Sequence, residues 1–252
     1  MLRELGFTVR AAGEELHGCA EVTPFGHVPG TGYLRTSVLA SWADMLAGLL
    51  AMRTLAPRVP VTLELDVHLY RHAPAGGEVR AVGRTVRHGR SVSVSCVDFF
   101  EASGARFGFA AGSFMAAPDA SLTLPEVTSI DAPPPGVRLA MPLADRAGCK
   151  RLAPGVAELP RSEDGLNSLN TVNGGLLALV AEEAVLSLVP GATLSSLGLR
   201  YLRPVRTGPA VATARVDSGL GQVELRDAGA GDRLAMMATA RLCYGDAVNV
   251  AR

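Results

Sequence analysis

Two acidic residues stand out because each interrupts an otherwise apolar run at an equivalent place. Asp44 lies within the run Val38 to Met52, and Glu182 lies within the run Leu176 to Val189. A carboxylate among apolar neighbours is costly, so such residues are usually either ion-paired or functional. A carboxylate can attack a carbonyl carbon directly, or it can activate water for that attack. We therefore treat Asp44 and Glu182 as candidate catalytic groups.

The residues that open the second apolar run form another candidate feature. Asn173, Gly174 and Gly175 precede its first leucine. A helix start presents unpaired N–H groups and about half a positive charge, which suits the oxyanion formed when a carbonyl is attacked. Glycine lets a substrate approach the backbone closely. Asn173 also fits an ordinary helix cap, and Asn167 fits a turn former, so structural roles for both remain open.

Helical periodicity predicts one helix in each half of the chain. The first runs from Thr36 to about Met52, and the second from about Gly174 to Leu188, where Pro190-Gly191 stops it. Four segments rich in β-branched and aromatic residues follow each helix, and turn residues separate them. In the first half they are Val61–Tyr70, Glu78–Val86, Ser91–Phe100 and Arg106–Met115. In the second half they are Leu194–Leu202, Ala210–Val216, Gln222–Asp227 and Arg233–Cys243.

This repeated order predicts an α+β architecture with two similar domains. The short turns predict an antiparallel meander of the four strands in each half. A sheet with one apolar face can wrap a central helix and bury it nearly all round, which explains helices with few polar positions. A segment rich in proline and glycine separates the halves. We predict domains at 1–120 and 151–252, joined by a linker at 121–150.

Composition narrows the possible partners. The 252 residues carry a formal net charge of zero, which gives no indication of a nucleic-acid or membrane-surface partner. Both apolar runs are interrupted and too short to cross a bilayer, so we expect no membrane insertion. The four cysteines have no metal-ligand spacing, and we expect reduced thiols in a cytoplasmic protein with no metal and no cofactor. The absence of net charge permits a homo-oligomer.

At the second helix start the residues resemble a known family. Asn173-Gly174-Gly175 followed by Glu182 resembles the hotdog thioesterases of the PaaI and 4-hydroxybenzoyl-CoA thioesterase group, many of which carry His-Gly-Gly with an acid nine positions after the histidine. Asparagine replaces that histidine here. In the first half, Arg35 to Asp44 keeps only the spacing and the acid. The resemblance implies tandem hotdog folds, each an antiparallel sheet wrapped round a central helix, packed as a pseudo-dimer.

The resemblance also implies hydrolysis of an acyl-thioester such as an acyl-CoA, with coenzyme A present only as part of the substrate. It assigns the Gly174 N–H to polarising the thioester carbonyl, and the Asn167 amide to orienting the substrate. Asp44 or Glu182 supplies the carboxylate. Asn173, Gly175, Arg35 and Thr36 then line the substrate, and Arg90 contacts coenzyme A phosphates; Arg35 equally fits a structural ion pair.

Distance along the helix decides how these groups combine. Gly174 and Glu182 are eight residues apart, which is about 12 Å on one helix, whereas reacting groups must lie within about 3.5 Å. Each site must therefore join the helix start of one repeat to the carboxylate of the other. Asp44 with Gly174 and Asn167 has every part, whereas Glu182 with Thr36 lacks the glycines and the amide. We predict an active first site and a weakened second site.

Two other functions remain open from the sequence. One is a catalytically degenerate double hotdog that binds acyl-CoA or acyl chains, because the histidine and one glycine pair are missing. The other is a hydratase or dehydratase of acyl-thioesters. His27-Val28-Pro29-Gly30 resembles the His-Phe-Pro-Gly stretch of acyl-carrier-protein dehydratases, but Ser41 stands where those enzymes need a glutamate.

Overall fold

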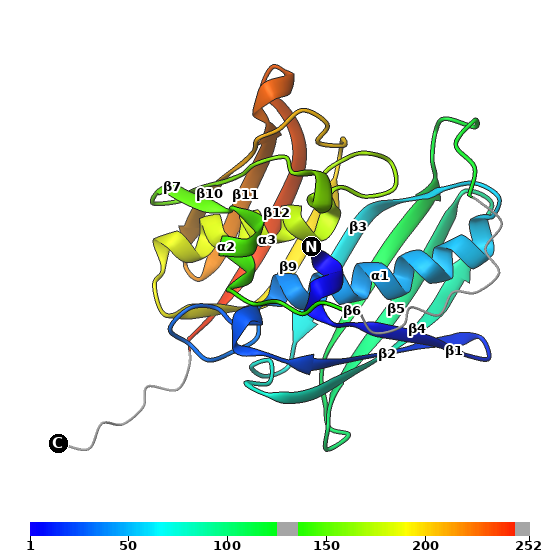
Figure 1. Ribbon diagram of the computed structural model, residues 1–252, viewed down its shortest axis with the longest axis horizontal. Helices are drawn as coiled ribbons and strands as arrows, with labels where there is room; N and C mark the ends of the chain where they lie inside the picture. The colour runs from blue at the N-terminus through cyan, green and yellow to red at the C-terminus, as the bar shows by residue number, and fades with distance from the viewer. Residues whose placement is uncertain (125–135, 245–252) are drawn as a thin grey trace.

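The computed structural model describes residues 1–124 and 136–244, and within this part of the chain the strands form a single antiparallel sheet (Figure 1). The order across the sheet is β1-β2-β4-β5-β6-β3-β9-β12-β11-β10-β8-β7. The first half supplies β1 (Thr8–Ala12), β2 (Glu15–Val22), β3 (Pro60–Leu69), β4 (Gly77–His88), β5 (Val92–Glu101) and β6 (Arg106–Ala116). The second half supplies β7 (Lys150–Ala153), β8 (Val156–Leu159), β9 (Ala192–Tyr201), β10 (Ala210–Asp217), β11 (Leu220–Asp227) and β12 (Arg233–Tyr244).

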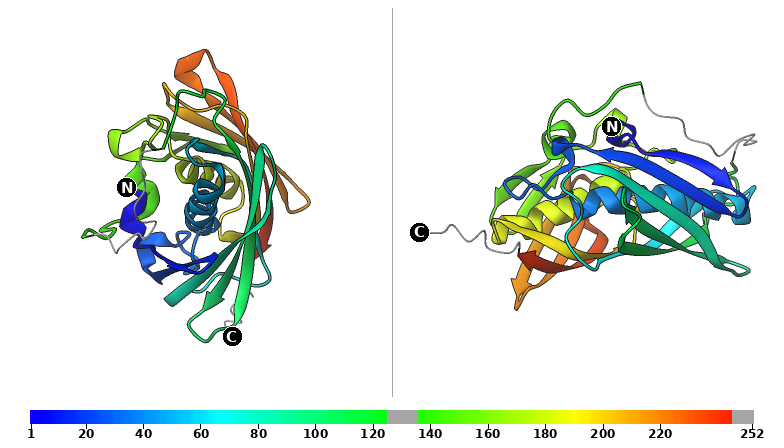
Figure 2. Two further views of the ribbon diagram at one scale, coloured as in Figure 1. Left: turned by 90° about the vertical axis from the view of Figure 1, so that its right-hand side faces the viewer. Right: turned by 90° about the horizontal axis from the view of Figure 1, so that it is seen from below.

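Two long helices, α1 (Thr36–Leu55) and α3 (Gly174–Leu188), lie on the concave side of this sheet and pack against each other (Figure 2). The sheet curves around both helices, so most of their residues are buried. The predicted tandem hotdog architecture is therefore confirmed. Short elements complete the chain: α2 (Leu143–Ala147) and the 3₁₀ turns η1 (Leu2–Leu5), η2 (Pro24–Gly26), η3 (Glu163–Gly165) and η4 (Ala228–Ala230).

Helix α1 is longer than the apolar run that predicted it. Its 20 residues are long and apolar enough to cross a membrane by length and composition alone. Its apolar character has a different physical reason here, because β3, β4, β5, β6 and α3 surround it. Residues such as Leu39 and Leu46 have no exposed surface. The helix belongs to the protein core.

The predicted meander is wrong in one respect. β4, β5 and β6 are sequential neighbours, but β3 pairs with β6 and not with β4. The connection 70–76 therefore crosses from one side of the repeat to the other. This placement leaves the second edge of β3 free to pair with β9, from Glu64 opposite Arg200 to His68 opposite Ser196. The pairing joins the sheets of the two repeats.

Two strands precede each long helix, and the sequence did not indicate them. β1 and β2 form an outer hairpin in the first half, and β7 and β8 form one in the second. Both outermost strands are largely exposed and short, so neither shows the apolar alternation that predicts a strand. These hairpins extend the sheet beyond the predicted four strands of each repeat.

The segment predicted as a linker is partly structured. Residues 125–135, which include the proline run, lie outside the described residues. Beyond them Leu139 and Leu143 are buried, and the Leu139 N–H donates to the Glu4 carbonyl oxygen at 3.1 Å. The C-terminal part of this segment therefore packs against the start of the chain.

Candidate active site

The start of α3 is fixed by Asn173. Its Oδ1 accepts a hydrogen bond from the Gly175 N–H at 2.9 Å, which is the usual arrangement of a helix cap. The Gly174 N–H has no acceptor among the residues that the structure describes. Gly174 therefore presents a free backbone donor at the positive end of the helix dipole.

Asn167 shapes the loop that leads into this helix. Its Oδ1 accepts from the N–H groups of Leu169 and Thr171 at 3.0 and 3.2 Å, and from the Thr171 hydroxyl at 3.1 Å. The amide oxygen is thus committed to the turn. The predicted substrate contact by Asn167 stays a prediction, and only its Nδ2 group is available for it.

Tyr201, at the end of β9, covers the first turn of α3. Its hydroxyl donates to the Gly174 carbonyl oxygen at 3.2 Å. A Cβ atom on Gly174 would lie 3.1 Å from that hydroxyl oxygen, so glycine permits this close approach. Burial, assisted by the nearby charge of Asp44, raises the pKa of Tyr201 well above its usual value. Tyr201 therefore connects the start of α3 to the carboxylate of α1.

Asp44 approaches this region from α1. The Thr62 hydroxyl on β3 donates a hydrogen bond to Asp44 Oδ1 at 3.0 Å. Asp44 is partly exposed to solvent. Burial raises the pKa of Asp44 to about 6, and the Thr62 hydrogen bond opposes that rise. A carboxyl group with this pKa is charged at neutral pH and still a good proton acceptor.

The glycine pair also has a packing role. A Cβ atom on Gly175 would lie 2.3 Å from the Ser41 hydroxyl oxygen and 3.0 Å from the Leu2 side chain. Ser41 is one turn before Asp44 on α1, so the absence of a side chain at Gly175 allows this part of α1 to approach the start of α3 closely. The structure thus brings Asp44, Tyr201 and Gly174 into one region.

We expect Gly175→Ala to destabilise the fold by about 1–3 kcal/mol, because the added methyl group overpacks the contact between α1 and α3. Denaturant unfolding measures the loss. Combining it with Ser41→Ala removes the nearest atom and should recover part of that loss. If the single and double variants were equally unstable, the Ser41 contact would not be the cause.

The second composite site has a different environment. Glu182 has no exposed surface. Its Oε1 accepts from the Thr36 N–H at 2.9 Å, so the carboxylate itself occupies the start of α1. Its Oε2 accepts from the Ser37 hydroxyl at 2.6 Å and from Arg35 Nη1 at 3.3 Å. The N–H group equivalent to that of Gly174 is therefore already used.

Arg35 ties this carboxylate into a buried ion network. Its guanidinium is 1% exposed and also lies 2.5 Å from Glu183, which Arg151 reaches from the other side at 2.6 Å. Burial raises the pKa of Glu182, and the charge of Arg35 and the Ser37 hydroxyl oppose that rise. Catalysis by Glu182, and substrate binding by Arg35 and Thr36, stay predictions, and this closed environment argues against all three.

Arg90 is not brought to either helix start. It is exposed in the β4–β5 turn. Ser93, at the beginning of β5, bonds to Thr54 near the C-terminal end of α1, about 15 Å along the helix from Asp44. A phosphate contact by Arg90 stays a prediction.

The sequence did not single out Thr62, Ser41 or Tyr201 as site residues. Tyr70 ends the equivalent predicted strand of the first half, but its side chain is 60% exposed, whereas Tyr201 contacts the start of α3. Tyr201 lies just beyond the β3–β9 ladder and is opposite Met236 of β12. Sheet register, which the chain alone does not display, was the missing signal.

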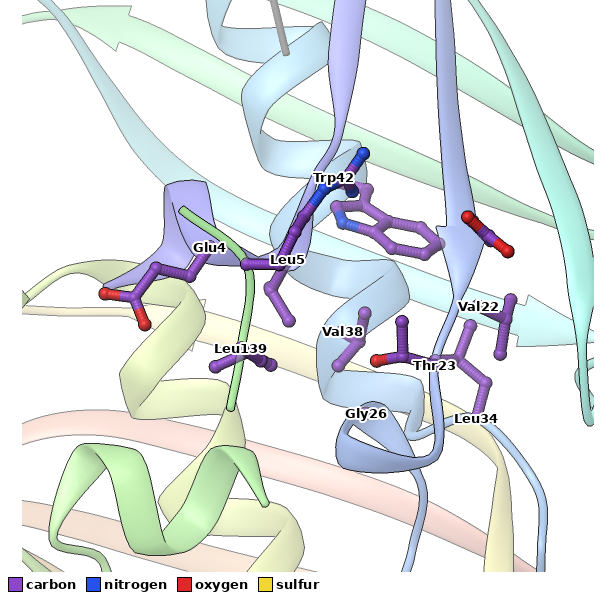
Figure 3. A pocket seen from close by; sticks show the side chains of 11 residues that line it. Glu4, Leu5, Val22, Thr23, Gly26, Leu34, Val38, Trp42 and Leu139 are labelled. Carbon is purple, nitrogen blue, oxygen red and sulfur yellow. The ribbon is translucent and has the colours of Figure 1, made fainter. Parts of the chain in front are cut away.

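A pocket lies on another face of α1 (Figure 3). Val38 and Trp42 line it together with Leu5, and its volume is about 300 Å³ including the open mouth. Asp44 lies two residues after Trp42, or about 200° round the helix, so this pocket is not part of the Asp44 region.

Residues 31–107 match the family model of the thioesterase superfamily. The match covers the first repeat from just before α1 to the start of β6, so this part of the chain is similar to that superfamily. A comparison with curated proteins finds no significant sequence match.

Solved structures resemble this chain over nearly its whole length. An acyl-ACP thioesterase from Bacteroides thetaiotaomicron is 15% identical, with a TM-score of 0.64 over 91% of this chain and 98% of that one. The 12:0-ACP thioesterase from Umbellularia californica is 14% identical, with a TM-score of 0.67 over 93% of this chain and 99% of that one. At these identities the likeness establishes a shared double-hotdog fold.

Proposed function

We propose that this protein hydrolyses an acyl-thioester at a single composite site, formed by Asp44 of the first repeat and the start of α3 in the second. The match of residues 31–107 to the thioesterase superfamily supports thioester hydrolysis as the general reaction. The observation that carries the choice of site is the contrast between the two helix starts. The Gly174 N–H has no acceptor among the described residues, whereas the Thr36 N–H is bonded to Glu182.

In this site the thioester carbonyl oxygen accepts from the Gly174 N–H. That donor and the helix dipole stabilise the negative charge that develops when the carbonyl carbon is attacked. The Asp44 carboxylate either removes a proton from the attacking water, or attacks the carbon itself to form a mixed anhydride that water cleaves after the thiolate has left. The thiolate then leaves and takes up a proton. Thr62 holds Asp44 Oδ1, and Tyr201 holds the first turn of α3 in place.

This mechanism predicts a specific pH dependence. The reactive form of Asp44 is the carboxylate, and burial raises its pKa to about 6. The hydrolysis rate should therefore fall as the pH drops below about 6 and become level above about 7. Thr62→Val removes the hydrogen bond that lowers this pKa, so the midpoint should move to higher pH in that variant. Rates that stay constant through pH 6 would contradict the assignment.

The substrate carrier is the finer part of the proposal. We propose an acyl-CoA as the substrate, with acyl-ACP as the competing carrier because structures of acyl-ACP thioesterases share this fold. We place the reaction in the cytoplasm, which is consistent with four free cysteines. A panel of acyl-CoA and acyl-ACP substrates of equal chain length, with a free-thiol readout, separates the carriers.

The same panel distinguishes the main alternative, a protein that only binds acyl chains. The closed helix start of the first repeat keeps this alternative open, because one of the two possible catalytic sites has no free N–H donor. Ligand-dependent thermal stabilisation without release of thiol would point to binding only. Continuous release of thiol supports hydrolysis.

A further inference from the structure

A cysteine and a histidine meet outside the Asp44 region. Cys243 lies near the end of β12, and His72 lies in the connection between β3 and β4. The Cys243 Sγ atom is 3.6 Å from His72 Nε2. The other ring nitrogen, Nδ1, is 3.3 Å from the Thr193 hydroxyl oxygen, and that hydroxyl donates to the Cys243 carbonyl oxygen at 3.3 Å.

These contacts determine where the protons lie. The Thr193 hydroxyl has one hydrogen, which it donates to the Cys243 carbonyl oxygen, so towards His72 it can only accept. In the tautomer that fits this donation, His72 Nδ1 carries the N–H and Nε2 presents its lone pair to the thiol. The Tyr33 ring stacks on the imidazole at 4.2 Å and 12° and holds its plane. A nucleophile, a base and a group that orients the base are the parts of an activated nucleophile.

The other cysteines provide a contrast. Burial raises the pKa of Cys19 to about 11 and that of Cys149 to about 12, and nearby glutamates add to both rises. Both thiols therefore stay protonated and unreactive at neutral pH. Cys243 and His72 are each partly exposed, so a reagent can reach the thiol.

The pair lies beside the closed helix start of the first repeat. Thr193 immediately precedes Leu194, whose carbonyl oxygen accepts from the Thr36 hydroxyl at 2.7 Å. The half of the molecule in which the carboxylate is sealed in an ion network therefore carries a different nucleophile nearby.

We propose that Cys243, with His72 as its base, is a second nucleophilic site that accepts an acyl group from an acyl-thioester; the substrate class rests on the proposed function. His72 Nε2 takes the thiol proton as Sγ attacks the carbonyl carbon. A new carbon–sulfur bond forms to Cys243, the original one breaks, and the departing thiolate takes the proton from His72. The product is S-acyl-Cys243 and one equivalent of free thiol.

The test uses full-length protein carrying Asp44→Asn, incubated with decanoyl-CoA and followed by peptide mass spectrometry. We expect Cys243 to be acylated at least about tenfold faster than Cys19 or Cys149, because of these three thiols only that of Cys243 contacts an imidazole, whereas burial and nearby glutamates raise the pKa of the other two. The adduct should be released by hydroxylamine. His72→Gln should slow acylation of Cys243 by at least about tenfold and leave the other cysteines unchanged.

Equal acylation of the cysteines, or no adduct at Cys243, would overturn the proposal. Because the rates at different cysteines are compared within one protein, this result does not depend on the folding of a second variant. An adduct rate unchanged by His72→Gln in a folded protein would overturn it as well. The hydrolysis proposal is tested separately, by comparing continuous thiol release by the wild type with that by Asp44→Asn. Equal rates of release would contradict hydrolysis at Asp44 without affecting the result for Cys243.

Discussion

Asp44→Asn should lower kcat for acyl-thioester hydrolysis by at least about a hundredfold, because general base or nucleophilic catalysis by a positioned carboxylate contributes that much or more. KM should change little, since the substrate is held mainly by the start of α3. Asparagine has the same shape and can still accept the Thr62 hydrogen bond. The loss therefore reports the charge and basicity of residue 44. Release of free thiol under saturating substrate measures kcat.

Stability is the control for this substitution. Burial raises the pKa of Asp44 above its ordinary value, to about 6, so the charged carboxylate is less stable in the folded protein than in the unfolded chain. At neutral pH, replacing it by a neutral amide should leave the free energy of unfolding unchanged or raise it. A variant that keeps wild-type kcat, while Glu182→Gln abolishes turnover, would show that the two carboxylates have the opposite roles.

Glu182→Gln should act in the reverse manner and lower the free energy of unfolding by about 3 kcal/mol. The substitution leaves Arg35, which is 1% exposed, with one of its two carboxylate partners. It also weakens the acceptor for the Thr36 N–H and the Ser37 hydroxyl. Denaturant unfolding at neutral pH measures the loss. Enough folded protein should remain for thiol release at the Asp44 site to continue.

A double substitution separates the charge effect from a packing effect. Arg35→Met together with Glu182→Leu replaces the buried ion pair by apolar side chains, and such replacements are often neutral or stabilising. Glu183 keeps Arg151 as its partner in this variant. The double variant should therefore be more stable than Glu182→Gln. A Glu182→Gln protein that unfolds like the wild type would mean that this network contributes little.

The helices and most strands could be predicted from the chain because their signals are local. The apolar periodicity that begins at Thr36 and at Gly174 marks the observed starts of α1 and α3. The order of strands in the sheet could not be predicted in the same way, because the β3–β6 and β3–β9 pairings depend on contacts between distant segments. The outer hairpins were missed because their exposed edges lack an apolar pattern.

The candidate site was predictable in part for similar reasons. Asp44 and Gly174 were indicated by residue type and spacing. The sequence did not indicate that Glu182 accepts hydrogen bonds from the start of α1, because Arg35 and Ser37 contact it only when the two helices pack together. Thr62 and Tyr201 come from strands, and nothing in their own sequence neighbourhood indicates that they meet α1 and α3.

The pairing of β3 with β9 inside one polypeptide has an evolutionary consequence. In an assembly of two identical subunits, every substitution appears twice, so one pocket cannot be altered without its mate. Here the position of Asp44 and the position of Glu182 are encoded independently, although the joined sheet holds them in nearly dyad-related settings. Each half is thus free to diverge under its own selection.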